Sequence, residues 1–220
     1  MSVTLVIGNK NYSSWSLRSW LLLRHFGVPF HEQRIPLSTP ETAAQLLAIS
    51  PAARVPVLLD GDLRVWDSLA IGEYVSEQYL GGRGWPQETS ARAHARSLAA
   101  EMHAGFQALR NAWPMNIRLQ RKLEPAPEVA DCIKRIDSMW SDCLAQHGGP
   151  WLFGEFSIAD AMYAPVVLRF HSYQPQLSAA AARYGQVMLA HPALQEWMDA
   201  ARAEVEIIEE EEIDFLAQKP

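Results

Sequence analysis

Residues Ile7 to Leu23 read IGNKNYSSWSLRSWLLL, and this stretch decides how the first part of the chain folds. The apolar run Val3 to Ile7 predicts a buried strand, and the pattern from Trp15 onward predicts a helix, with Ser13 and Ser14 between them. A helix N-terminus carries unpaired N–H groups and about half a positive charge, so it stabilises an anion or a thiolate. Serine is also a favoured N-cap residue, and on this stretch alone the capping role is the preferred interpretation.

The composition indicates a folded protein. Hydrophobic residues make up 49% of the 220 residues and charged residues 20%. The formal net charge of -6 and the lack of basic clusters argue against a nucleic-acid partner. No apolar run approaches the roughly 20 residues that span a bilayer. The N-terminus MSVTLVIGNK also lacks the features of a signal peptide. We therefore expect no membrane partner and a cytoplasmic location.

Strand and helix patterns alternate through the first 80 residues. Gly27 ends the first helix, and a strand at Phe30 to Ile35 and a short helix at residues 43–48 follow. Asp60-Gly61 between two apolar runs predicts a hairpin of residues 57–59 and 63–66, and a helix follows at residues 69–79. The order β-α-β-α-β-β-α is that of a thioredoxin-like α/β domain, which we assign to residues 1–80.

The glycine-rich segment at residues 81–84, followed by Trp85-Pro86, interrupts this pattern and predicts an interdomain linker over residues 81–89. The remainder, residues 90–220, has helical periodicity throughout and predicts an all-helical bundle domain. One apolar face runs unbroken from Leu98 to Trp113, where Pro114 interrupts or bends it, and predicts a single long helix.

Further helices are predicted around residues 133–144, from Ser157 onward and around residues 194–201. The glutamate-rich segment from Glu204 to Phe215 predicts a solvated terminal helix or tail and not an acidic binding arm.

Two further dipeptides are candidates for ligand binding. Pro56 precedes the third strand, where a thioredoxin-like domain commonly has a cis proline. We therefore expect a cis Val55-Pro56 bond that turns the Val55 backbone toward a bound peptide, although only about 5 to 6% of X-Pro bonds in general are cis. Asp67 and Ser68 open a helix, where they either cap it or hold the ends of an amino-acid-like ligand. Arg54 is either surface charge or a partner for a ligand carboxylate.

In this order and spacing, these features resemble the cytosolic glutathione transferase family over essentially the whole chain. Ser13 to Arg18, SSWSLR, is similar to the serine-type loop SSCSxR of the zeta class, with Trp15 in place of the cysteine. In the helical half, Phe156 to Asp160, FSIAD, resembles the capping box of the family, in which Ser157 caps the helix and Asp160 reaches back to its N–H.

The resemblance implies that glutathione is the co-substrate. We expect no metal and no nucleotide, because the seven histidines show no metal-ligand spacing, no Cys-x-x-Cys is present and the glycine-rich linker lacks a phosphate-loop lysine. The resemblance assigns Ser13 to the thiolate, with Ser14 and the Trp15 backbone N–H as helpers. It assigns Val55, preceding Pro56, to the cysteinyl backbone, Asp67 and Ser68 to the γ-glutamyl end and Arg54 to the glycine carboxylate. Candidates for binding the second substrate are the residues expected to face the cleft, namely Trp15, His103, Phe106, Arg110, Trp113, Met115 and Arg118.

The expected activity is conjugation of glutathione to small hydrophobic electrophiles, by a homodimer. Two alternatives remain open at this point. One is glutathione-dependent cis-trans isomerisation, as in maleylacetoacetate isomerase, which Trp15 in place of the cysteine makes less favourable. The other is a non-catalytic binding or stress-response protein, because the same fold serves several functions.

Overall fold

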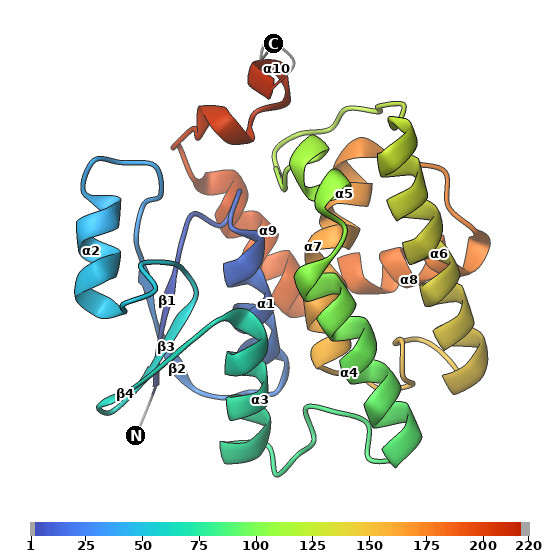
Figure 1. Ribbon diagram of the computed structural model, residues 1–220, viewed down its shortest axis with the longest axis horizontal. Coiled ribbons are helices and arrows are strands. Elements are labelled where there is room, and N and C mark those ends of the chain that lie inside the picture. Colours follow the sequence, from blue (N-terminus) through green and yellow to red (C-terminus); the bar gives the residue numbers. More distant parts are fainter. Residues whose placement is uncertain (1–2, 217–220) are drawn as a thin grey trace.

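A computed structural model describes residues 3–216, and it has a mixed α/β half followed by a helical half (Figure 1). The first half contains β1 (Val3–Ile7), α1 (Ser14–His25), β2 (Phe30–Arg34), α2 (Thr42–Ile49), β3 (Val57–Asp60), β4 (Leu63–Trp66) and α3 (Ser68–Gln78). The second contains α4 (Thr89–Ala104), α5 (Gln107–Ala112), α6 (Pro127–His147), α7 (Ile158–Tyr173), α8 (Ala179–Leu189), α9 (Pro192–Ala203), the 3-10 turn η1 (Glu209–Glu211) and α10 (Ile213–Leu216).

The predicted thioredoxin-like order is confirmed. The four strands form one sheet in the order β2-β1-β3-β4, with β1 parallel to β2 and antiparallel to β3. Asp60 pairs with Leu63 across the predicted hairpin, where Gly61 adopts a positive φ of 57°. Such a φ suits glycine because it has no Cβ to clash.

The two faces of the sheet belong to different cores, because successive side chains on a strand alternate in direction. Leu5 and Ile7 join the main core with α1 and α3. Val6 packs with Leu46 of α2 in a small second cluster on the opposite face. Helices α1 and α3 therefore lie between the sheet and the helical half, and α2 covers the outer side (Figure 1).

Local signals explain both ends of α1. Ser13 is the N-cap, and its hydroxyl accepts from the Ser16 N–H. At the other end, Gly27 has φ 66°, the Gly27 N–H bonds to the Arg24 carbonyl, and the Val28 N–H bonds to the Leu23 carbonyl at 3.0 Å. This pair of bonds is the Schellman motif that ends many helices at a glycine.

The helical half departs from the sequence prediction after residue 104. The predicted continuous helix from Leu98 to Trp113 is wrong, because α4 ends at Ala104 and α5 begins only at Gln107. Phe106, between them, has a left-handed φ of 58°. A Cβ on Gly105 would lie 2.7 Å from the Glu101 carbonyl oxygen, so this close turn requires glycine. The apolar period continues across the break, which is why periodicity did not detect it. Helix α8 was not predicted as a separate element.

The C-terminal segment is not a solvated tail over its described length. The Glu204 carboxylate accepts the backbone N–H groups of Lys10 at 2.7 Å and Asn11 at 3.0 Å. Further along, the Glu212 carboxylate accepts from Tyr12 at 2.6 Å and Asn116 at 3.0 Å. These bonds join the glutamate-rich segment to the loop between β1 and α1 and, through Asn116, to the segment after α5. Across residues 3–216, no helix combines the length and the apolar character needed to cross a membrane.

Asp160 caps α7 as predicted and also joins two other segments, the loop at Leu152 and helix α8. Its fully buried carboxylate accepts the N–H of Ser157 at 2.9 Å, the N–H of Leu152 at 3.1 Å and the hydroxyl of Tyr184 at 3.1 Å. Burial raises its pKa to about 6, so the carboxylate is ionised at neutral pH. The interaction is therefore more extensive than a capping box alone.

We predict that Asp160→Ala lowers the free energy of unfolding by about 2 to 4 kcal/mol, because it leaves several buried donors without an acceptor. Urea denaturation measures the loss. Asp160→Asn keeps one acceptor oxygen and should be affected less. Asp199→Ala, which removes an exposed ion pair with Arg202, should change stability by less than about 1 kcal/mol. An Asp160→Ala protein as stable as the Asp199→Ala control would contradict this role.

Candidate functional site

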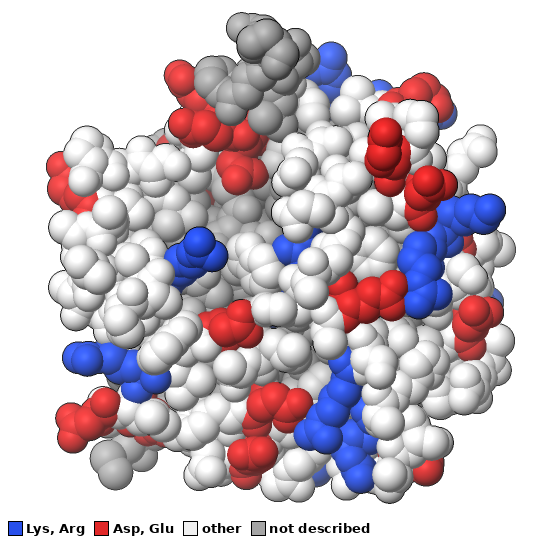
Figure 2. Space-filling view, viewed as in Figure 1, with Lys and Arg blue, Asp and Glu red and all other residues white. Residues whose placement is uncertain are grey.

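Two adjoining cavities lie where the α/β half meets the helical half, and both are bordered by Trp15, Arg54 and Val55. The first, of about 480 Å³, is also lined by Tyr12, Ser13, Ser14, Leu37, Ser38, Leu46, Ala53, Gln107, Arg110, Arg169, Ile208 and Glu211. The second, of about 530 Å³, is also lined by Ala52, Pro56, Trp66, Asp67, Ser68 and His103. Figure 2 shows a hollow between the two halves, below the C-terminal segment, with both basic and acidic side chains around it. Both volumes fall within the usual range for small-molecule sites.

The two serines before α1 have different environments. The Ser13 hydroxyl is buried and donates to the Ser16 hydroxyl at 2.7 Å, in addition to capping the helix. The Ser14 side chain is half-buried, and its hydroxyl makes no hydrogen bond within the described part of the chain. The hydroxyl that is free to donate to a ligand is therefore that of Ser14, whereas the sequence prediction had favoured Ser13.

Backbone donors add to this end of the cavity. The Ser14 N–H donates to the Tyr12 carbonyl at 2.9 Å, but the Trp15 N–H has no backbone partner among residues 3–216. An unpaired N–H in the first turn of a helix, together with the helix dipole, favours negative charge. The start of α1 thus offers a hydroxyl and an N–H to one anionic atom.

The Val55-Pro56 bond is cis, as predicted. Neither the N–H nor the C=O of Val55 forms a backbone hydrogen bond in the described residues, although β3 begins two residues later. An unpaired backbone unit of this kind can pair with an extended ligand as an added strand does. Arg54, which precedes it, is exposed and borders both cavities.

Asp67 caps α3, which is one of the two roles that its sequence position suggested, and it also contacts the helical half. One carboxylate oxygen caps α3 by accepting the N–H groups of Leu69 at 2.9 Å and Ala70 at 3.3 Å. The other lies 3.1 Å from Nε2 of His103 on α4, so the pair bridges the two halves of the molecule. Asp67 has φ 75°, a conformation that costs a non-glycine residue about 1 to 3 kcal/mol and that concentrates at functional sites.

At Ser68, the backbone N–H is free of backbone partners in the described chain, whereas the hydroxyl is buried. Its buried hydroxyl lies 4.0 Å from the sulfur of Met162, which is a weak contact. Its N–H, at the first position of α3, has no backbone partner in the described chain. We therefore assign the ligand-binding capacity of Ser68 to the N–H.

The structure divides the residues predicted to face the second substrate. Trp15, His103 and Arg110 border the cavities. Trp113, 3% exposed, and Met115, 0% exposed, lie in the core, and Trp113 stacks on Tyr173 with ring centroids 5.0 Å apart. Side chains buried in this way cannot contact a substrate in this conformation. Phe106 is half-buried in the turn after α4 and borders neither cavity.

Arg118 also lies outside both cavities. Its guanidinium donates to the carbonyls of Glu204 at 2.7 Å and Glu206 at 2.8 Å and to the Tyr12 hydroxyl at 2.7 Å. All of these acceptors belong to the C-terminal segment or to the loop before α1. Arg118 therefore joins these two segments and does not border either cavity.

Sequence reasoning missed Arg169, Gln107, Ile208 and Glu211, which border the first cavity. Arg169 is 6% exposed, and burial lowers its pKa to about 10. A detectable signal existed for it, because it is a single charge within the otherwise apolar run Ala164 to Phe170. No comparable signal marks Gln107 or Ile208, which become neighbours of α1 only through tertiary packing.

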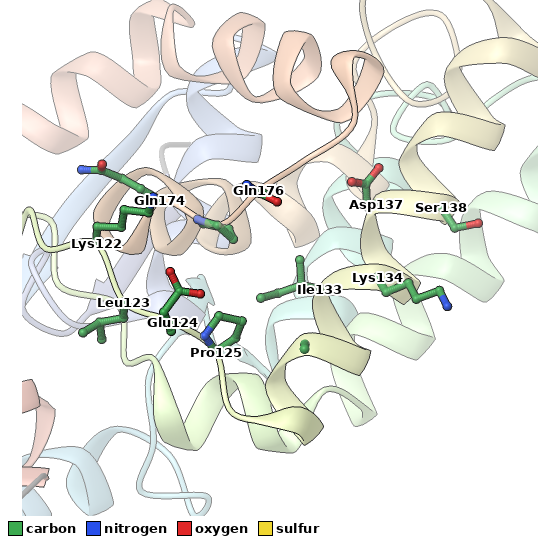
Figure 3. A pocket seen from close by; sticks show the side chains of 12 residues that line it. Lys122, Leu123, Glu124, Pro125, Ile133, Lys134, Asp137, Ser138, Gln174 and Gln176 are labelled. Atoms are coloured by element: carbon green, nitrogen blue, oxygen red, sulfur yellow. The ribbon is translucent and has the colours of Figure 1, made fainter.

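Another hollow, of about 570 Å³, lies away from this site, between α6 and the loops before it and after α7 (Figure 3). None of the predicted site residues contributes to it. Across residues 3–216, no three His, Cys, Asp or Glu side chains lie close enough together to share a metal ion.

Two family patterns match the chain. The pattern described as "Glutathione S-transferase, N-terminal domain" matches residues 12–78, and "Glutathione S-transferase, C-terminal domain" matches residues 92–200. Together they cover most of both halves and include the serine loop, the Val55-Pro56 bond and Asp67.

Individual proteins show similarity over comparable lengths. A probable maleylacetoacetate isomerase of Caenorhabditis elegans is 27% identical over 75% of this chain and 77% of its own. Glutathione S-transferase 1 of Dianthus caryophyllus is 29% identical over 85% of this chain and 81% of its own. Among solved structures, a glutathione transferase homolog from Burkholderia gl BGR1 with bound glutathione has a TM-score of 0.70 at 23% identity, over 92% of this chain and 99% of that one.

We predict that Arg118→Gln lowers the free energy of unfolding by about 1 to 3 kcal/mol, because it removes charged hydrogen bonds to two carbonyls and a hydroxyl. Urea denaturation measures this loss, and limited proteolysis should show faster cleavage after residue 203. Arg202→Gln, which removes only an exposed ion pair, is the control. Unchanged stability with altered substrate affinity in Arg118→Gln would instead return Arg118 to the substrate-binding set.

Proposed function

This chain belongs to the glutathione S-transferase family, and we propose that it is a glutathione transferase that transfers the glutathione thiolate to small electrophiles. The observation that carries the proposal is that two sets of unpaired groups lie in adjoining cavities. One is the Ser14 hydroxyl with the Trp15 N–H at the start of α1. The other is the Val55 backbone beside the Asp67 end of α3.

Glutathione fits these groups in one orientation. The Val55 N–H and C=O pair with the cysteinyl backbone. Asp67 faces the γ-glutamyl ammonium, and the Ser68 N–H at the start of α3 faces the α-carboxylate, in agreement with the charge preferred at a helix N-terminus. Arg54 faces the glycine carboxylate. The thiol then lies toward the start of α1.

The groups at the start of α1 are sufficient to activate the thiol. A free thiol has a pKa near 8.5, and lowering it by about two units requires roughly 2.7 kcal/mol of differential stabilisation. A hydrogen bond to a charged acceptor contributes about 1.5 to 3 kcal/mol, and a helix terminus up to about 1 kcal/mol more. The thiolate attacks a carbon that carries a leaving group such as chloride. A C–S bond forms, the halide departs with the bonding electrons, and the thiol proton is released to solvent.

Isomerisation is a second candidate, supported by the similarity to a probable maleylacetoacetate isomerase. In that reaction the thiolate adds to a conjugated double bond and is eliminated after rotation, so glutathione is regenerated. Both reactions use the same activated thiolate. They differ in whether a conjugate accumulates.

We also propose a homodimer. Leu63 and Trp66 are 46% and 45% exposed on β4, which is an edge strand of the sheet. Light scattering at micromolar concentration should give twice the mass of the chain, and a monomer mass would contradict the assignment.

The proposed function is tested first by thermal unfolding in reduced glutathione and then by turnover. Saturating glutathione should raise the melting temperature, because a ligand that binds only the folded state stabilises it. Asp67→Asn should reduce this shift, whereas Asp62→Asn, on the nearby hairpin turn, should not. Chlorodinitrobenzene reports conjugation and maleylacetone reports isomerisation. A glutathione-dependent shift without turnover of either compound would identify a binding protein instead.

The two serines give the sharpest prediction. Ser14→Ala should raise the pKa of bound glutathione toward its free value by about one to two units and reduce turnover about 10- to 100-fold. Ser13→Ala should mainly lower stability, by about 0.5 to 2 kcal/mol, because it removes the N-cap of α1. Ultraviolet absorbance of the thiolate against pH measures the first effect and urea denaturation the second. If the thiolate is lost in Ser13→Ala but kept in Ser14→Ala, the two roles are exchanged.

A further inference from the structure

Two arginines of the helical half line the first cavity, and a third arginine, Arg18, packs on Trp15 without lining the cavity. The guanidinium carbons of Arg18 and Arg110 lie 4.2 Å and 4.7 Å from the ring centroid of Trp15. Arg110 and Arg169 both line the cavity. We call these three residues the arginine cluster. Burial lowers the pKa values of Arg18 and Arg169, and repulsion from the neighbouring arginine charges lowers them further.

The positive charge of the cluster is not neutralised locally. Arg18 is 2% exposed, and its Nε and Nη1 atoms have no hydrogen-bond partner in the described residues; the same is true of Arg110 Nε. Within residues 3–216, none of the three forms an ion pair with an acidic side chain. A buried charge without a counterion is costly, and such charges gather where a ligand of opposite sign binds.

The donors that are used hold the cluster in place. Arg110 donates to the carbonyls of Met102 and, at 3.1 Å, His103, which the end of α4 leaves without helical partners. Arg169 donates from Nε to the Trp113 carbonyl at 2.8 Å and from Nη1 to the Pro165 carbonyl at 3.3 Å. Carbonyl oxygens fix the positions of the guanidiniums without removing their net charge.

Two acidic side chains act on the cluster: Asp67 opposes the lowering of the Arg18 pKa, and Glu211 of the C-terminal segment opposes the lowering of the Arg169 pKa. Glu211 lines the same cavity as Arg110 and Arg169 and is half-buried, whereas Glu209 and Glu210 in the same turn η1 are exposed. The turn is held over the cavity by buried Ile208, whose carbonyl accepts the Glu211 N–H at 2.9 Å. Burial raises the pKa of Glu211, and the proximity of Arg169 opposes that effect.

We propose that the arginine cluster binds a carboxylate group of the second substrate, and that Glu211 lowers the affinity for this group in the free protein. This inference rests on the proposed function and names the class of electrophile, an organic acid. The hollow in Figure 3 has no comparable preference for an anionic ligand, since Lys122 and Lys134 line it together with Glu124 and Asp137. The first cavity combines an excess of positive charge, from Arg54, Arg110 and Arg169 against Glu211, with the start of α1.

Binding of meta-nitrobenzoate and of its neutral methyl ester, measured by isothermal titration calorimetry, tests the site. Glu211→Gln should tighten binding of the benzoate about 3- to 10-fold by removing one nearby like charge, and should leave the ester unchanged. Glu210→Gln makes the same charge change at an exposed position and should alter either affinity less than about twofold. Arg110→Gln, checked for an unchanged melting temperature, should weaken the benzoate selectively.

The proposal is overturned if Glu211→Gln changes both probes equally, if Glu210→Gln has the same effect, or if neither the original protein nor Glu211→Gln binds the benzoate. Turnover of a chloronitrobenzoate and its methyl ester separates this inference from the proposed function. If the ester is conjugated and the acid is not preferred, the result supports the proposed transferase activity and contradicts the anion site. If benzoate binding depends on Glu211 but neither compound is conjugated, the result supports the anion site and contradicts the proposed transferase activity.

Discussion

The burial of α1 between the sheet and the helical half is the contact on which the rest of the structure depends. Leu17, Trp20 and Leu21 are fully buried, and each contributes about 1.5 to 3 kcal/mol through removal of apolar surface from water. Trp20 joins both halves, because its ring packs edge-on against Trp197 of α9 and its Nε1–H donates to Glu32 of β2 at 2.7 Å. The N-terminus of α1 is thereby fixed at the junction where the cavities open. A helix held on several sides can present an N–H and a hydroxyl without rearranging when a ligand binds.

The two sides of the junction between the α/β half and the helical half differ in their charged groups. At the α/β side, helix N-termini and Arg54 suit a ligand with a thiolate and carboxylates, and Asp67 provides the one acidic contact there. At the helical side, the arginine cluster is buried with few compensating charges, and Glu211 approaches it from the C-terminal segment. The same segment is fastened to the loop before α1 by Glu204 and Arg118. The helical side of the cavity is therefore bordered by residues that are far from α1 in sequence.

Several parts of the site could be predicted because each rests on a local rule. The cis Val55-Pro56 bond, the Asp67 cap of α3 and the capping residues of α7 each occupy a few consecutive positions with a characteristic spacing. The different hydrogen bonding of Ser13 and Ser14 could not be predicted in this way, since it depends on the hydroxyl of Ser16 accepting from Ser13. Trp113 belonged to the predicted apolar face, but tertiary packing places both Trp113 and Met115 in the core, away from the cavities.

By itself, the sequence determined the order of strands and helices in the first half, the helical character of the second and the local caps, because strand alternation, helix periodicity and capping chemistry act over a few neighbouring residues. Only the tertiary structure decided that α4 ends at Ala104, that Arg110 then turns back to the carbonyls it exposes, and that Arg169 and Glu211 reach the same cavity. The reason is physical. Burial and charge proximity depend on distances between segments that are remote in sequence, and an uninterrupted apolar period contains no information about a turn that one glycine permits.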